Sequence, residues 1–191
     1  MSPLVRTAVG LFLGVALFGQ TPSSQTRIQF APGGAVTLKL EAGEYDLQPG
    51  AEDAIVVTWT ADDPEAPEIR IQAKGTEATV VIADTPRHHF RARVQLPART
   101  DLRVRLTAGD LRVGAFEGNK DLRLRAGNLT VMVPQPEQYG QVHASLWAGD
   151  IHAPAFGGER DGLFRSFRYE GRGTFVLRAA LWAGDLTLAK P

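Results

Sequence analysis

Short runs in which apolar and polar residues alternate recur along the chain. Leu102, Val104 and Leu106, for example, alternate with Arg103 and Arg105. Alternation with a period of two places successive side chains on opposite faces of a β-strand. The 191 residues also include 20 Gly and 12 Pro, which suits many short strands joined by tight turns better than long helices. We therefore expect an all-β protein.

One motif, Leu-x-Ala-Gly followed by Asp, Asn or Glu, occurs five times. The copies are residues 40–44, 106–110, 124–128, 146–150 and 181–185. Alternating residues flank the copies, so the expected unit is strand, corner, strand. Glycine adopts a positive φ without penalty, and Asp or Asn can bond its own local backbone. The predicted corner residues are Gly43, Gly109, Gly127, Gly149 and Gly184, with Asp110, Asn128, Asp150 and Asp185 following four of them.

The spacing of the motif suggests stacked coils. Successive motif glycines are 66, 18, 22 and 35 residues apart. Intervals near 20 residues are typical of one coil of a β-solenoid, and the longer ones indicate degenerate coils or insertions. We expect a repeat β-solenoid, similar to a β-helix, as one domain over residues 25–191. A β-sandwich of hairpins with the same corners is the alternative, because spacing alone does not separate the two.

The N-terminus has the layout of a secretory signal peptide. Residues 7–19 are uncharged and largely apolar, follow Arg6 and precede a polar segment. Thirteen residues are too few to span about 30 Å of hydrocarbon as a helix. We expect residues 1–24 to be removed, leaving no transmembrane span, in preference to an uncleaved anchor or a buried helix. The expected location is the periplasm, the outer cell surface or the medium.

The segments 94–113, 122–131 and 171–188 carry the motif in a shared alternating pattern and resemble the bacterial putative-adhesin family. These are exported proteins of unknown function, similar to the head regions of autotransporter adhesins. The resemblance covers residues 35–190. It implies a right-handed β-helix at the cell envelope with no established catalytic residues. This chain departs from the family pattern in having Trp at two motif positions and a long acidic first segment.

Catalytic and metal sites find little support in the sequence. The absence of Cys excludes disulfides, thiolate catalysis and Cys-ligated metals. Asn128 and Glu44 replace the motif Asp in two copies, which a turn tolerates and a general acid or base would not. One carboxylate per coil is too sparse for a calcium-binding β-roll. Ser145 and His143 lack a nucleophile elbow and a placed acid. His143 and His152 flank one corner, where two imidazoles alone would make a weak site. We expect no enzyme activity, no metal and no cofactor.

Charge is unevenly distributed although the formal net charge is zero. Residues 41–68 contain nine acidic and no basic residues, whereas residues 87–125 contain ten basic and four acidic ones. We expect two solvated faces that attract each other within the fold. An anionic partner for the basic face is the alternative.

The residues at the second position of the motif are the most informative ones for function. This position holds Glu41, Thr107, Arg125, Trp147 and Trp182. If Leu and Ala face inward, these side chains face outward, and exposed aromatic rings can stack on sugars. The alternative is that residues 153–173, which are rich in Gly and aromatics, cover the two tryptophans. A basic stripe is expected beside them, formed by Arg103, Arg105, Arg112, Arg123 and Arg125.

These features together predict an exported, non-catalytic, adhesin-like binding or interaction module of the bacterial cell envelope. Its expected partner is a glycan, an anionic envelope component or a protein, and not nucleic acid. Two alternatives stay open. One is a structural envelope component that assembles with its own copies, and the other is a carbohydrate-active enzyme on a β-helix scaffold.

Overall fold

The structure is a computed structural model that describes residues 23–50, 52–160 and 163–190, so nearly all of the expected signal peptide lies outside the described residues. Strands dominate these residues, and the all-β prediction is confirmed. The strands are β1 Ser23–Gln29, β2 Ala35–Leu40, β3 Gly43–Pro49, β4 Ala54–Thr60, β5 Glu68–Lys74, β6 Glu77–Ala83, β7 Arg91–Leu96, β8 Asp101–Val113, β9 Lys120–Ala126, β10 Leu129–Met132, β11 Tyr139–Ala148, β12 Ile151–Ala153, β13 Gly158–Arg160, β14 Leu163–Glu170, β15 Phe175–Ala183 and β16 Leu186–Ala189. In the described part of the chain, no helix is long and apolar enough to cross a membrane.

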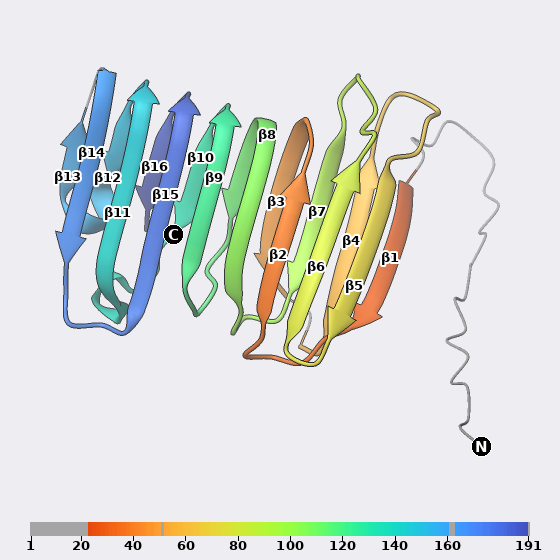
Figure 1. Ribbon diagram of the computed structural model, residues 1–191, viewed down its shortest axis with the longest axis horizontal. Coiled ribbons are helices and arrows are strands. Elements are labelled where there is room, and N and C mark those ends of the chain that lie inside the picture. Colours follow the sequence, from red (N-terminus) through yellow and green to blue (C-terminus); the bar gives the residue numbers. More distant parts are fainter. Residues whose placement is uncertain (1–22, 51, 161–162, 191) are drawn as a thin grey trace.

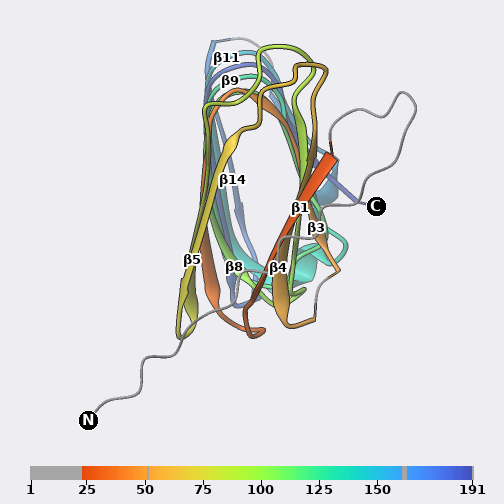
Figure 2. The same cartoon turned by 90° about the vertical axis from the view of Figure 1, so that its right-hand side faces the viewer.

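The strands form two sheets that face each other (Figures 1 and 2). The front sheet of Figure 1 has the order β5-β6-β2-β8-β9-β15-β11-β14. The back sheet has the order β1-β4-β7-β3-β8-β10-β16-β12-β13. Strand β8 is long enough to contribute its first half to the front sheet and its second half to the back sheet. Each motif copy lies where the chain passes from front to back.

We use the word coil for a front strand together with the back strand that follows it, and six such strand pairs lie side by side with parallel pairing within each sheet. Their order in space is β6/β7, β2/β3, β8, β9/β10, β15/β16 and β11/β12. Antiparallel strands close the ends of the stack: β1, β4 and β5 at one end and β13 and β14 at the other. Spatial order therefore departs from chain order at two places, β6/β7 and β15/β16.

The core lies between the two sheets and follows from the alternation. In β8, Leu102, Val104 and Leu106 point inward with exposures of 1 to 3%, while Arg103 and Arg105 are exposed. Burial of these apolar side chains is the main stabilising contribution of each coil. Lys120 is the one charged side chain in the core of the described chain.

The motif glycines form a column in which backbone packs directly on backbone. Gly43 pairs with Gly109 across β3 and β8, and Gly127 follows in the next coil. Gly127 has φ +120°, and a Cβ placed on it would lie 1.9 Å from the carbonyl oxygen of Gly109. Only glycine permits this conformation and this approach. Gly184 and Gly149 repeat the contact in the next two coils.

The residues after these glycines form a hydrogen-bonded ladder. Oδ1 of Asp110 accepts bonds from the backbone N–H of Asn128 at 3.2 Å and from its Nδ2 at 3.0 Å. Oδ1 of Asn128 accepts from the N–H of Asp185, and Oδ1 of Asp185 accepts from the N–H of Asp150, both at 3.2 Å. The sequence suggested a bond within each turn. The observed bonds instead join one coil to the next.

The acidic and basic segments partly meet on the outer face of the back sheet. Glu44 of β3 pairs with Arg91 of β7 at 2.8 Å, and Asp46 pairs with Arg93 at 3.2 Å. The partners are neighbours because β3 and β7 run in parallel register. These pairs are largely exposed, so each contributes less than about 1 kcal/mol.

Candidate functional site

Trp147 and Trp182 stack on each other on the outer face of the front sheet. Strands β11 and β15 pair with Leu146 opposite Leu181, which places the next residues side by side. The two rings are 4.8 Å apart and inclined by only 3°. Trp147 is 40% exposed and Trp182 is 58% exposed. The two tryptophans thus lie on neighbouring coils and face solvent.

Phe164 extends the pair on the β14 side. Its ring lies 5.2 Å from that of Trp147 at 77°, in an edge-on contact, and it is 71% exposed. The antiparallel register of β11 and β14 brings it there, because Leu146 pairs with Arg165. We call Trp182, Trp147 and Phe164 the aromatic stack.

The segment 153–173 does not bury the stack. Phe167 is in the core, and Phe156 and Tyr169 pack against the core. Among the described residues of this segment, Phe164 is the aromatic residue whose ring contacts a tryptophan, on the side of Trp147 that faces away from Trp182. The alternative that this segment covers the two tryptophans therefore holds for one face of the Trp147 ring only.

A mainly basic groove lies on the front sheet next to the strand that carries Trp182. It has a volume of about 580 Å³ and lies over β6, β2, β8 and β9. Its cationic lining residues are Lys39, Arg105, Arg123 and Arg125, and Glu41 is its acidic one. Arg123 pairs with Asp121 at 3.2 Å, whereas no ion pair within the described residues involves Lys39, Arg105 or Arg125.

The predicted stripe of arginines is divided between the sheets. Arg103, Arg105, Arg123 and Arg125 are exposed on the front sheet. Arg112 lies on the back sheet, opposite Asp46 of β3 and Thr130 of β10. Its assignment to the stripe was wrong, because it follows the corner and the second half of β8 belongs to the other layer.

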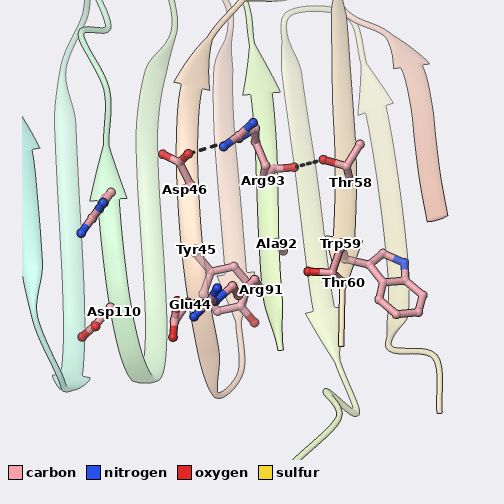
Figure 3. Close-up of a pocket in the computed structure, with 11 residues that line it drawn as sticks. Glu44, Tyr45, Asp46, Thr58, Trp59, Thr60, Arg91, Ala92, Arg93 and Asp110 are labelled. Atoms are coloured by element: carbon pink, nitrogen blue, oxygen red, sulfur yellow. Dashed lines mark hydrogen bonds and ion pairs between the residues drawn. The ribbon is translucent and has the colours of Figure 1, made fainter. Parts of the chain in front are cut away.

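A second open pocket lies on the back sheet and was not predicted (Figure 3). It also has a volume of about 580 Å³ and lies over β4, β7, β3 and β8. The Glu44–Arg91 and Asp46–Arg93 pairs occupy it, and Oγ1 of Thr58 donates to the carbonyl oxygen of Arg93 at 3.5 Å. Most of its charges are already neutralised locally, which makes it a weaker candidate than the front face.

The histidines and corner carboxylates do not converge on a reaction centre in the described chain. His143 lies on the front sheet and His152 on the back sheet, so the two cannot meet across their corner. His89 lies in a loop and its Nδ1 is 2.6 Å from Asp62. Oδ1 of Asp110 and of Asp185 accepts bonds from the backbone of the neighbouring coil. Among the residues described, no group of three or more His, Cys, Asp or Glu is placed to hold a metal ion.

Lys120, the first residue of β9, is a buried titratable group held by three hydrogen bonds. Its Nζ donates to the carbonyl oxygens of Phe116 at 2.8 Å and Gly118 at 3.1 Å and to the Tyr139 hydroxyl at 2.6 Å. Burial lowers the pKa of Lys120 to about 8, and Asp101 opposes the shift. With all three protons engaged and the side chain 1% exposed, this amine is a structural crosslink at the base of the coils.

Comparison with known proteins gives a match only at the level of structure. No family model matches the chain, and no curated protein matches it significantly. A solved structure from Clostridium sporogenes, titled a "putative cell adhesion protein", aligns with a TM-score of 0.56 and 13% identity over 89% of this chain and 100% of that one. The two proteins share a fold. A "putative adhesin" from Parabacteroides distasonis aligns with a TM-score of 0.29 and 11% identity over 88% of this chain and 70% of its own.

Proposed function

We propose that the protein is an exported, non-catalytic, adhesin-like binding module of the bacterial cell envelope, and that it contacts its partner through the aromatic stack. The observation that carries the proposal is the exposure of two stacked indole rings with Phe164 beside them. Grouped exposed aromatics favour contact with another surface, since covering them removes apolar area from water.

The scaffold suits such a role because it is rigid at the site. The glycine column and the Asp/Asn ladder connect the corners of adjacent coils next to the stack. We infer a β-solenoid-like framework that holds the rings in place before a partner arrives. Preorganised side chains lose little conformational freedom on binding, which favours affinity.

Three further observations support this function. The fold is shared with a protein titled as a cell adhesion protein, the motif pattern resembles the putative-adhesin family, and residues 7–19 have the layout of an export signal. An enzyme on the same scaffold is disfavoured, because Asp110 and Asp185 already bond backbone of the neighbouring coil.

Self-assembly through the sheet edges is the second candidate. Within the described residues, strands β5 and β14 each pair on one side only, which leaves unpaired backbone groups at both ends of the front sheet. Such edges can template pairing with another chain. Sedimentation of the purified protein over a range of concentrations would separate this role from a monomeric binding module.

Tryptophan fluorescence tests the proposed contact surface directly. Trp59 is 7% exposed and serves as an internal reference for the exposed pair. We expect acrylamide to quench Trp147 and Trp182 strongly, and an envelope polysaccharide to protect them in the wild type. The Trp147→Ala/Trp182→Ala variant should keep its circular dichroism spectrum and urea midpoint but lose the response. If the variant only loses stability and no envelope fraction alters wild-type emission, the tryptophans are structural and the proposal fails.

A further inference from the structure

We propose that the ligand is an acidic polysaccharide that runs across the strands of the front sheet, with one sugar ring on the free face of Trp182 and its carboxylate or sulfate group on Arg125. The chain would continue over Arg105 and Lys39. This inference rests on the proposed function and assigns a ligand class and a direction to it.

Trp182 stacks on Trp147 through one ring face. The two rings are parallel with centroids 4.8 Å apart, which matches the spacing of adjacent strands. One face of Trp182 is covered by Trp147. The other therefore faces β9, where the parallel register places Arg125 opposite it. In the described chain, no ring contact occupies that face.

A saccharide ring fits a site of this kind. The apolar C–H side of a sugar packs on an aromatic face, while its polar groups stay at the rim. At the free face of Trp182, the nearest charged neighbour in the row is Arg125, whose planar guanidinium can form two parallel bonds to a carboxylate or sulfate. One aromatic face beside one guanidinium selects an acidic sugar over a neutral one.

A row of cations lies beside Arg125, two residues earlier along the strands. Lys39, Arg105 and Arg123 occupy directly paired positions on β2, β8 and β9, so they are neighbours about 4.8 Å apart along the row. Like charges placed opposite each other across strands destabilise a sheet. Of these three cations, only Arg123 has its repulsion reduced by an ion pair, which it forms with Asp121. A polyanion lying along the row would neutralise all three, so charge complementarity points to the ligand.

The row continues past the tryptophans through small residues. Arg123 pairs with Ala180 of β15, and Ala180 pairs with Ser145 of β11. These small side chains leave room for a ligand beside the stack, and Arg178 and His143 border the row on its other side. The path is thus a continuous strip with an aromatic wall at one end and cations along the rest. An extended chain suits it better than an acyl chain, which needs a deep apolar pocket.

Titration calorimetry with polysaccharides of different charge tests the proposal. Polygalacturonate and heparin supply carboxylated and sulfated chains, and dextran is the neutral control. We expect the acidic chains to bind and the affinity to fall with rising salt. Trp182→Ala and Arg125→Gln should each lower the affinity at least about tenfold, equal to about 1.4 kcal/mol. Arg112→Gln removes the same charge from the back sheet and should change the affinity less than about twofold.

The experiments distinguish failure of the acidic-ligand proposal from failure of the proposed function. Equal binding of dextran, or unchanged affinity in Arg125→Gln with a normal urea midpoint, overturns the acidic ligand but leaves a binding module. Binding to vesicles of phosphatidylglycerol in phosphatidylcholine, with none to polygalacturonate or heparin, overturns it in favour of a membrane surface. If no ligand alters the emission of the wild type and the tryptophan variants only lose stability, the proposed function fails as well.

Discussion

Replacing Gly127 with Ala should damage the corner column far more than a comparable change elsewhere. Gly127 has φ +120°, and its new Cβ would lie 1.9 Å from the carbonyl oxygen of Gly109. A non-glycine residue in such a backbone conformation costs about 1–3 kcal/mol. Because the obstacle is backbone, the coils must also separate, which weakens the bond from the Gly127 N–H to the Ala183 carbonyl oxygen at 3.0 Å by about 1 kcal/mol. The expected loss is about 2–4 kcal/mol.

Gly75→Ala is the matched control. Gly75 also has a positive φ, +60°, but nothing lies within 4 Å of its Cβ position in the turn between β5 and β6. Its expected cost is about 1 kcal/mol, from backbone conformation alone. The difference between the two variants isolates the contact between coils.

Urea unfolding followed by circular dichroism measures both costs. With a slope of about 2 kcal/mol per M, Gly127→Ala should lower the midpoint by about 1–2 M and Gly75→Ala by about 0.5 M. Equal shifts in the two variants would refute the reasoning, because the direct packing of one glycine on the next would then contribute nothing.

Three further predictions concern the ladder, the buried amine and the charged pairs. Asn128→Asp removes the bond from Nδ2 to Asp110 and sets two carboxylates together, so we expect a loss of about 1–2 kcal/mol that shrinks as salt rises, while Asn128→Ser shows no salt effect. Because burial lowers the pKa of Lys120 to about 8 from 10.5, the folded chain binds fewer protons than the unfolded chain between these values. The free energy of unfolding should therefore rise from pH 8 to about 9.5, below the ordinary range of phenol ionisation, in the wild type and not in Lys120→Met. A double-mutant cycle on Asp46 and Arg93 should give a coupling below about 1 kcal/mol, and a coupling above about 2 kcal/mol would contradict the weak role assigned to this exposed pair.

Much of the local structure could be predicted because it depends on alternation. The two arms around each motif copy are strands, and the motif marks the passage between layers. Lys120 is in phase with Leu122 and Leu124, a signal that it points inward, but its partner Tyr139 comes from another coil and leaves no mark in the local pattern.

The order of the coils could not be predicted from the motif. All five copies share the same corner, so each offers nearly the same surface to any other. The placement of β15/β16 between β9/β10 and β11/β12 depends on contacts that only the folded chain makes, as in the pairing of β15 with both β9 and β11. The same order brings Arg125 next to Trp182, and it is the reason that the aromatic and basic parts of the candidate site are continuous.

The position of the last coil also governs when the protein can finish folding. Residues 139–170 join the rest of the stack largely through β15 and β16, which lie at the C-terminal end of the described chain. During synthesis, the earlier coils can assemble as they emerge, but β11 and β12 must wait for β15 and β16. A chain shortened before Phe175 would retain a stack ending at β9/β10 and carry the Trp147 segment as an unattached tail.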